Sequence, residues 1–151
     1  MSRRPMRVRA VAVVIYDDET LLVESKHSPG SWVPPGGRVE SREALHEAAV
    51  REVAEETGVQ VETAGMIAYR ELWWGEEDLL EFYFAARPFG ESAGWAGSGP
   101  EGRPAKWVRL EDLGSLQHYP LALHALCRLA QEALEGPELV AWHMGTEEVR
   151  E

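Results

Sequence analysis

A glycine turn that leads into a helix with a row of glutamates is the feature that most constrains this chain. Helical geometry advances 100° per residue, so within the predicted helix 42–57 Glu52 and Glu56 fall at the edge of the apolar stripe and Glu55 lies beside it. The apolar stripe consists of Leu45, Ala49 and Val53. Like charges at this spacing cost about 0.2–0.5 kcal/mol even when exposed, and burial raises the cost.

No lysine or arginine follows Glu52 or Glu55 by three or four residues, so the pattern itself offers no cation to neutralise them. A hard cation such as Mg2+, which proteins hold through carboxylates and water, is one solution. The other interpretation is an acidic helix face in contact with solvent.

The longer pattern around these glutamates decides between the two interpretations. It reads Gly37, five residues, Glu43, seven residues, then Arg51-Glu52-Val53, Glu55-Glu56 and Gly58-Val59. This pattern resembles the Nudix box and matches it at every fixed position, which far exceeds what a short motif normally supports. The preceding Trp32-Val33-Pro34-Pro35-Gly36 also resembles the family's approach to the box. The resemblance implies an α/β fold, the Nudix α/β/α sandwich with a mixed β-sheet between helices.

The resemblance also implies a metal site. In Nudix enzymes, the counterparts of Glu52, Glu55 and Glu56 hold the metal, and the counterpart of Gly37 supplies a backbone carbonyl. The expected cofactor is Mg2+, with Mn2+ as an alternative. Such ions neutralise phosphate oxygens and lower the pKa of a bound water that attacks phosphorus.

Two further roles follow from the same resemblance. The counterparts of Glu43 and Arg51 join the loop to the helix by an ion pair, so both residues belong to the expected catalytic set. A carboxylate must accept a proton from the attacking water. Glu52 is the preferred general base, and Glu91 or Glu101 in the later glycine-rich loop is the alternative.

Length and composition indicate the number of domains, the partners and the compartment. The chain has 151 residues, which predicts one domain over residues 1–151, with a core at about 8–134 and a C-terminal extension at 135–151. A net charge of −11 disfavours nucleic acid as a partner, because nucleic-acid binding depends largely on lysine and arginine. The single cysteine, Cys127, lies among leucines and is predicted to be a small buried side chain, which fits the reducing cytoplasm.

Hydropathy alternation and turn residues give the order of elements. The apolar run at 10–16 is too short for a secretory signal and is predicted to be a buried strand, so no membrane partner is expected. The predicted strands are 8–16, 21–23, 60–72, 79–86 and 107–110, and the predicted helices are 42–57, with Ser41 as N-cap and Gly58 as terminator, and 121–134. The chain is expected to be a monomer or a homodimer.

Four positions are candidates for substrate binding, and a fifth for the metal. Lys26 either faces a nucleotide phosphate, as in MutT-type Nudix enzymes, or is solvated. Trp73 and Trp74 point to opposite strand faces, so one of them should be accessible to a base or a dimer partner. Glu101 occupies the position of a further metal-ligand glutamate in MutT-type enzymes, or is an exposed loop acid. Leu123 stands where those enzymes place an asparagine that reads an oxidised purine.

The resulting functional prediction is Mg2+-dependent hydrolysis of a nucleoside triphosphate to the monophosphate and pyrophosphate, a housecleaning reaction. ADP-ribose, nucleotide-sugar or dinucleoside polyphosphate hydrolysis is the alternative, although the proline and tyrosine signatures after the box are absent from residues 60–86. A non-catalytic nucleotide-sensing domain is the alternative from another class. The box keeps every acid, which favours an enzyme.

Overall fold

The apolar N-terminal segment forms the central strand of a mixed sheet in the computed structural model, which describes residues 5–90 and 97–136. This strand, β1 (Met6–Tyr16), pairs in parallel with β6 (Glu77–Pro88) and antiparallel with β2 (Glu19–Glu24) and β4 (Gly36–Arg38). The other strands are β3 (Trp32–Val33), β5 (Val61–Trp74), β7 (Gly97–Ser98) and β8 (Pro104–Arg109). Their order is β5-β6-β1-β2-β8-β7, with β3 beside β2 and β4 beside β1.

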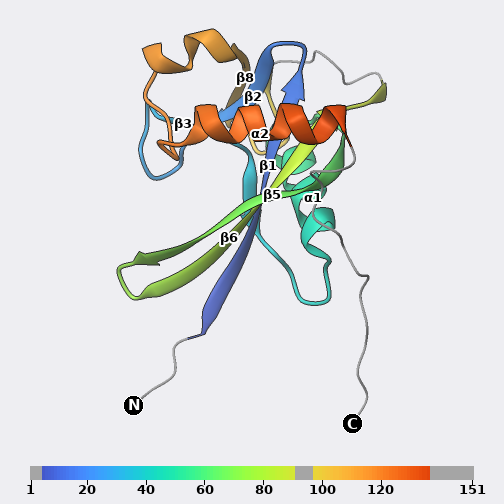
Figure 1. Ribbon diagram of the computed structural model, residues 1–151. Coiled ribbons are helices and arrows are strands. Elements are labelled where there is room, and N and C mark those ends of the chain that lie inside the picture. Colours follow the sequence, from blue (N-terminus) through green and yellow to red (C-terminus); the bar gives the residue numbers. More distant parts are fainter. Residues whose placement is uncertain (1–4, 91–96, 137–151) are drawn as a thin grey trace.

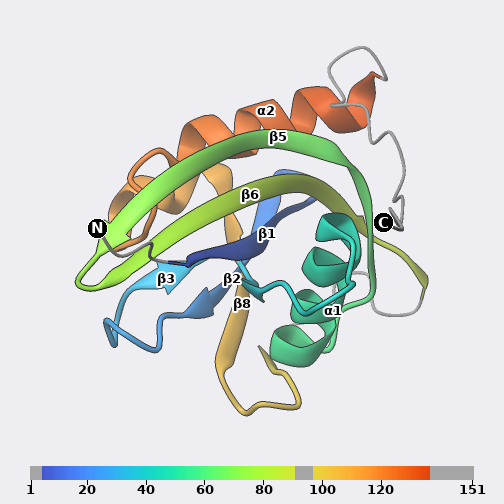
Figure 2. The same cartoon turned by 90° about the horizontal axis from the view of Figure 1, so that it is seen from below.

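Two helices cover opposite faces of this sheet, α1 (Leu45–Thr57) and α2 (Leu123–Glu135) (Figures 1 and 2). Successive side chains of a strand point to opposite faces, so β1 contributes to two hydrophobic clusters. The α1 cluster takes Ala10, Ala12 and Val14, and the α2 cluster takes Val11, Val13 and Ile15. Burial on both faces is the reason why β1 is continuously apolar, and the predicted sandwich is confirmed.

The predicted hairpin between β1 and β2 is present, with Asp17 in the left-handed region at φ 52°. The hairpin of β5 and β6 is longer than predicted. Residues 73–78, predicted to be a connecting loop, are mostly paired, since Trp73 opposes Asp78 and Trp74 opposes Glu77. Only a two-residue turn remains, and Gly75 adopts the positive φ of 60° that such a turn requires.

The box helix starts later than predicted. It begins at Leu45 with Ala44 as a cap that makes no side-chain bond, so the expected N-cap at Ser41 is wrong. Arg42 has a positive φ of 63°, which interrupts helical geometry before the first turn. The predicted end is confirmed, because Gly58 is left-handed at φ 78° and its N–H bonds to the Ala54 carbonyl.

The second helix, predicted at 121–134, runs from Leu123 to Glu135. Its inner face includes Cys127, which is fully buried and unpaired as expected, and burial raises the pKa of its thiol to about 11. A 3-10 helix, η2 (Leu110–Ser115), joins β8 to the segment before α2. Within the described ranges, no helix has the length and apolar character needed to cross a bilayer.

Candidate functional site

A cleft of about 1200 Å3 opens where the hairpin strands β1 and β2 separate. β1 and β2 pair only beside their turn, and farther along β4 occupies the edge of β1 while β3 occupies the edge of β2. The cleft connects the acidic edge of α1 with the β5–β6 hairpin and the segment that precedes α2. It therefore collects residues from most parts of the chain.

The box glutamates border this cleft and are buried to different degrees, as the helical pattern predicts. Glu56 is 3% exposed, whereas the side chains of Glu52 and Glu55 are 13% and 46% exposed. The glycine turn packs directly on them. A Cβ at Gly37 would lie 2.5 Å from the Glu52 carboxylate, and the Gly36 N–H donates to Glu56 Oε2 at 3.3 Å. The absence of a side chain at Gly37 thus allows the turn to pack against Glu52, and the backbone N–H of Gly36 connects it to Glu56.

Arg51 organises the exposed side of the acidic cluster. Its Nε and Nη2 donate to both oxygens of Glu43 at 2.7 and 2.9 Å, and its Nη1 donates to Glu52 at 3.0 Å and to Glu55 at 3.1 Å. Its hydrogen bond lowers the pKa of Glu43, and Glu43 in turn raises the pKa of Arg51. The ion pair implied by the Nudix resemblance is therefore present. The expectation that Glu52 and Glu55 have no cation is wrong, because Arg51 precedes them by one and four residues.

Arg103, which the sequence did not single out, performs the same function for the most buried acid. Its Nη1 lies 3.1 Å from Glu56 Oε1, and its Nε and Nη2 donate to the Glu24 carbonyl at 3.2 and 2.6 Å. Burial raises the pKa of Glu56 to about 7; Arg103 opposes the shift, and the charges of Glu52 and Glu101 add to it. The only sequence signal for Arg103 was its position two residues after Glu101.

The structure brings two more predicted residues to the cleft. Lys26 and Glu101 both line it, and Lys26 Nζ lies 3.8 Å from Glu101 Oε2. Trp73 is 82% exposed and lies outside the lining, so it does not contribute to this cleft. The side chain of Trp74 and the alternative base Glu91 lie outside the described part of the chain.

Leu123 does not occupy the position that the sequence assigned to it. It is fully buried in the α2 cluster, because α2 begins at this residue and turns its first side chain toward the sheet. The cleft-lining residues of this segment are Tyr119, Pro120, Leu121, Ala122 and Leu126. The prediction that Leu123 contacts the base is corrected accordingly.

The donor chemistry of the acidic end fits a hard metal ion. Glu52, Glu55, Glu56, Glu101 and Gly37 border one cleft, and carboxylates with a backbone carbonyl are ligands that Mg2+ accepts. Among the residues that the structure describes, however, no three acidic, histidine or thiol side chains are close enough together to hold one ion. Arg51 occupies carboxylate oxygens of Glu52 and Glu55, and Arg103 occupies one of Glu56, so these oxygens face arginines. A metal would have to replace those ion pairs.

A second charged cluster lies in the same cleft and was also missed. Glu81 is 5% exposed and accepts hydrogen bonds from Arg9 Nε at 3.0 Å, Arg70 Nε at 2.7 Å and the Tyr83 hydroxyl at 3.0 Å. Burial raises the pKa of Glu81, but the hydrogen bond and charge of Arg70, with the charge of Arg9, bring it below its usual value. The sequence feature that could have indicated this cluster was a single glutamate within the apolar strand segment 79–86.

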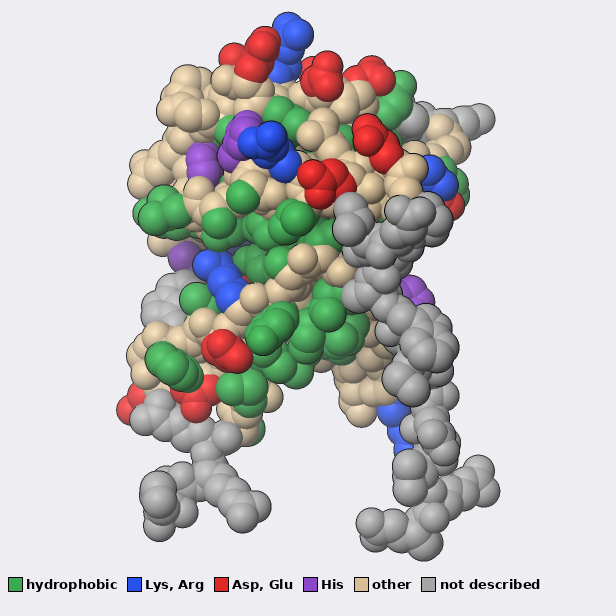
Figure 3. Space-filling model, viewed as in Figure 1, with side chains coloured by type: hydrophobic (Ala, Val, Ile, Leu, Met, Phe, Trp, Pro, Cys, Tyr) green, Lys and Arg blue, Asp and Glu red, His purple; other side chains and the backbone are tan. Residues whose placement is uncertain are grey.

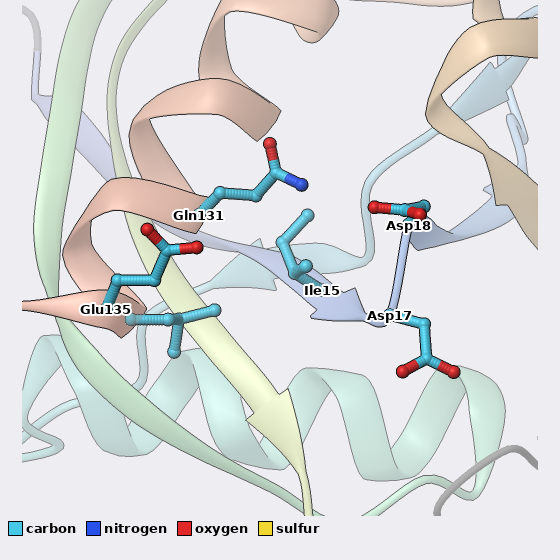
Figure 4. Close-up of a pocket in the computed structure, with 6 residues that line it drawn as sticks. Ile15, Asp17, Asp18, Gln131 and Glu135 are labelled. Atoms are coloured by element: carbon cyan, nitrogen blue, oxygen red, sulfur yellow. The ribbon is translucent and has the colours of Figure 1, made fainter.

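A smaller hollow of about 550 Å3 lies between the end of β1 and the end of α2 (Figure 4). Its lining consists of Ile15, Asp17, Asp18, Gln131, Leu134 and Glu135. None of these residues belongs to the predicted site, and among the described residues no basic side chain lines the hollow to complement a phosphate. The large cleft is therefore the candidate functional site.

A glycine turn followed by a carboxylate-bearing helix, which packs on one face of a mixed sheet while a second helix covers the other face, defines a Nudix-type protein. The NUDIX domain family profile matches residues 6–129, and the chain belongs to that family. The family match and curated relatives that are named phosphohydrolases support the expected enzyme class, a Nudix pyrophosphohydrolase.

One similar curated protein is diphosphoinositol polyphosphate phosphohydrolase 2 of Rattus norvegicus, 34% identical over 115 residues that cover 75% of this chain and 63% of that protein. The chain spans less than two thirds of the length of the first curated relatives it matches. Two solved structures show the same fold. A NUDIX hydrolase from Nitrosomonas europaea has a TM-score of 0.70 at 20% identity, covering 94% of this chain and 100% of that one. An ADP-ribose pyrophosphatase from Streptococcus suis has a TM-score of 0.62 at 20% identity, covering 86% and 92%.

Proposed function

We propose that this chain is a divalent-metal-dependent hydrolase that cuts a diphosphate bond in a small-molecule substrate. The observation that carries the proposal is the contact of the Gly36–Gly37 turn with the carboxylates of Glu52 and Glu56 in one large cleft. Glu52, Glu55, Glu56 and the Gly37 carbonyl would hold the metal, with Glu101 as a further ligand. When bound, Mg2+ or Mn2+ neutralises phosphate oxygens and makes water a better nucleophile.

The protein's own residues supply orientation and proton transfer. Glu52 is the proposed general base, because Arg51 and the Gly37 backbone fix its carboxylate at the edge of the cleft. Glu101 is the alternative base, since its partly exposed carboxylate also lines the cleft. Lys26 and Arg103 would bind phosphate oxygens, as cationic donors form strong hydrogen bonds with them.

Nucleoside triphosphates are the first candidate substrates, with the monophosphate and pyrophosphate as products. Lys26 and Glu101, the two positions that carry the MutT-type resemblance, lie 3.8 Å apart in the cleft, which supports this choice. The segment before α2 offers mainly apolar side chains to a base, and apolar contacts discriminate by only about 1–3 kcal/mol. Several triphosphates should therefore be hydrolysed within roughly a hundredfold of one another in kcat/KM.

Diphosphoinositol polyphosphates are the second candidate substrates. The relatives that are 33–34% identical carry that activity in their names, and two arginines, Arg9 and Arg70, line the cleft beyond the box. The Streptococcus suis neighbour supports ADP-ribose more weakly, because at 20% identity it shows the fold alone.

Metal binding is tested by thermal melting of the purified protein. A ligand that binds only the native state stabilises it by about 2.7 kcal/mol at a hundredfold excess over Kd, so Mg2+ should raise the Tm and EDTA should reverse the rise. The Glu56→Gln variant should show a smaller shift, because it lacks one ligand charge. Equal shifts in both proteins would place the metal elsewhere.

Catalysis is tested with a panel of nucleoside triphosphates, ADP-ribose, dinucleoside polyphosphates and a diphosphoinositol polyphosphate in the presence of Mg2+. Reaction in 18O-labelled water identifies the attacked phosphorus from the product that gains the label. Hydrolysis of one class with loss in Glu56→Gln is the expected result. A metal-dependent Tm shift with no turnover of any substrate would favour the nucleotide-sensing alternative.

A further inference from the structure

Three charged residues form a row across neighbouring strands at the end of the cleft away from the box helix. In the sheet register, Arg9 of β1 is the partner of Glu81 in β6, and Glu81 is the partner of Arg70 in β5. Directly opposed residues place their side chains on the same face of a sheet. Two guanidinium groups therefore flank a single carboxylate.

The hydrogen bonds within this row involve only the Nε atom of each arginine. Arg9 and Arg70 both bind Glu81 through Nε, and no residue in the described ranges accepts a hydrogen bond from their Nη atoms. The two arginine side chains are 32% and 39% exposed, whereas that of Glu81 is 7% exposed. The carboxylate is thus hidden beneath two guanidiniums that face the cleft.

The charges of the row do not cancel. One arginine and the Tyr83 hydroxyl would satisfy Glu81, so the second guanidinium adds a positive charge that no carboxylate in the row neutralises. Burial of an ion network carries a desolvation cost, and the chain as a whole has a net charge of −11. A local positive excess in such a protein points to an anionic ligand.

The row lies close to the proposed cutting site. Arg9 is the strand partner of Arg38, and the next pair along the two strands is Ala10 with Gly37. Arg9 lies on the strand face of Val11 and Val13 in the α2 cluster, whereas Ala10, the partner of Gly37, belongs to the α1 cluster. Both groups nevertheless line the same cleft of about 1200 Å3, which also includes Arg70 and Glu81 at one end and Glu52 and Glu56 at the other. One small molecule that fills this cleft can therefore contact both ends.

We propose that Arg9 and Arg70, positioned by Glu81, form an anion subsite for a phosphate group of the substrate other than the diphosphate that is cut. Guanidinium groups suit this role because their planar donors match phosphate oxygens in a fixed fork geometry. The inference rests on the proposed function and narrows its substrate class to diphosphates that carry an additional phosphate ester.

The subsite is first tested without hydrolysis, by titration calorimetry of the full chain in EDTA with inositol hexakisphosphate. This probe has many phosphate esters but no diphosphate bond. Arg9→Gln and Arg70→Gln should each raise its Kd about tenfold, because a charged hydrogen-bond donor is lost. Each variant leaves Glu81 with one arginine and Tyr83, and Tm measurements report whether the fold is retained.

Arg87→Gln is the matched control. Arg87 pairs through Nε with Glu62 at 2.6 Å on the same two strands, but neither residue lines the cleft. The control changes net charge by the same amount and should leave the Kd within twofold. If the Kd rises equally in all three variants, or does not rise in Arg9→Gln and Arg70→Gln, the probe binds only as a non-specific polyanion. Either result would overturn the subsite.

A kinetic comparison connects the subsite to catalysis. The wild-type protein should prefer a nucleoside triphosphate that carries a 3′-phosphate over its unmodified counterpart by about tenfold in kcat/KM, mainly through KM. Arg9→Gln and Arg70→Gln should lose this preference, and Arg87→Gln should keep it. If no substrate is hydrolysed but binding of the probe still depends on both arginines, the proposed function is refuted and the subsite is not. If every variant hydrolyses the substrates with the same preference, the subsite alone is refuted.

Discussion

The two ends of the cleft are built from the same two residue types in opposite proportions. At the box end, four glutamates share two arginines, whereas at the β5–β6 end two arginines share one glutamate. The first set is Glu43, Glu52, Glu55 and Glu56 with Arg51 and Arg103, and the second is Arg9 and Arg70 with Glu81. The residue type in excess indicates the missing partner, a cation at one end and an anion at the other.

The two most buried carboxylates show the same contrast. Glu56 and Glu81 are 3% and 5% exposed, so burial raises the pKa of both. Glu81 has two arginines and a tyrosine hydroxyl, which bring its pKa below the usual value. Glu56 has one arginine and two acidic neighbours, and its pKa remains raised at about 7. The two carboxylates are similarly buried, but their pKa values shift in opposite directions because the neighbouring charges differ.

The largest expected effect comes from removing the cation that organises the acidic end. Arg51→Ala should cost about 3 kcal/mol of unfolding free energy, because it leaves the largely buried carboxylates of Glu43 and Glu52 without their partner. Turnover should fall as well. Denaturant unfolding in EDTA measures the loss, and Arg38→Gln, which removes an exposed arginine, is the control. An equal cost in both variants would show that the acidic cluster does not depend on Arg51.

Glu56→Gln should reduce turnover at saturating Mg2+ by about a hundredfold, because loss of a ligand or its charge impairs the metal site. The shape of the side chain is retained, so the fold should persist. Steady-state kinetics with Glu62→Gln as the control measures the effect, since Glu62 is an exposed acid outside the cleft. Near-wild-type turnover in Glu56→Gln would contradict the site assignment.

The pH dependence of stability in EDTA should separate the two buried acids. The folded-state pKa of Glu56 is raised from 4.5 to about 7, so the unfolded chain releases this proton first and stability falls as pH rises between these values, by about 3 kcal/mol at most. The pKa of Glu81 is lowered, so its stabilisation is present above pH 4.5 and is lost as pH falls through the folded pKa.

Difference profiles isolate these two contributions. The stability of wild type minus that of Glu56→Gln should fall as pH rises between about 4.5 and 7. The stability of wild type minus that of Glu81→Gln should instead fall as pH drops below 4.5. Chemical denaturation at fixed pH values provides the measurement. Parallel profiles for the two variants would mean that the charges around Glu56 and Glu81 do not differ as the geometry indicates.

The smallest effect is expected outside both ends of the cleft. Trp73 is 82% exposed and does not line the cleft, so Trp73→Ala should change stability by less than about 0.5 kcal/mol and leave kcat/KM unchanged. Fluorescence-monitored unfolding and the substrate panel test this prediction. A clear loss of activity would restore the original assignment of Trp73 to substrate binding.

The sequence by itself determined the features that depend on local periodicity. The box spacing identified the glycine turn, the acidic stripe and the end of the helix at Gly58, because these features lie within one helix and the turn before it. The apolar pattern of β1 similarly predicted a strand buried on both faces. Such patterns require no knowledge of which distant segments meet.

Only the tertiary structure decided which charges are neutralised and by which partners. Arg9 and Glu81 are 72 residues apart in the chain, and their contact depends on the parallel register of β1 and β6, which no local pattern specifies. The pairing of Arg103 with Glu56 and the burial of Leu123 likewise follow from how distant segments fold over the sheet. Electrostatic interactions act between neighbours in space, so the register of the strands and the packing of α2 gave the cleft its acidic end and its basic end.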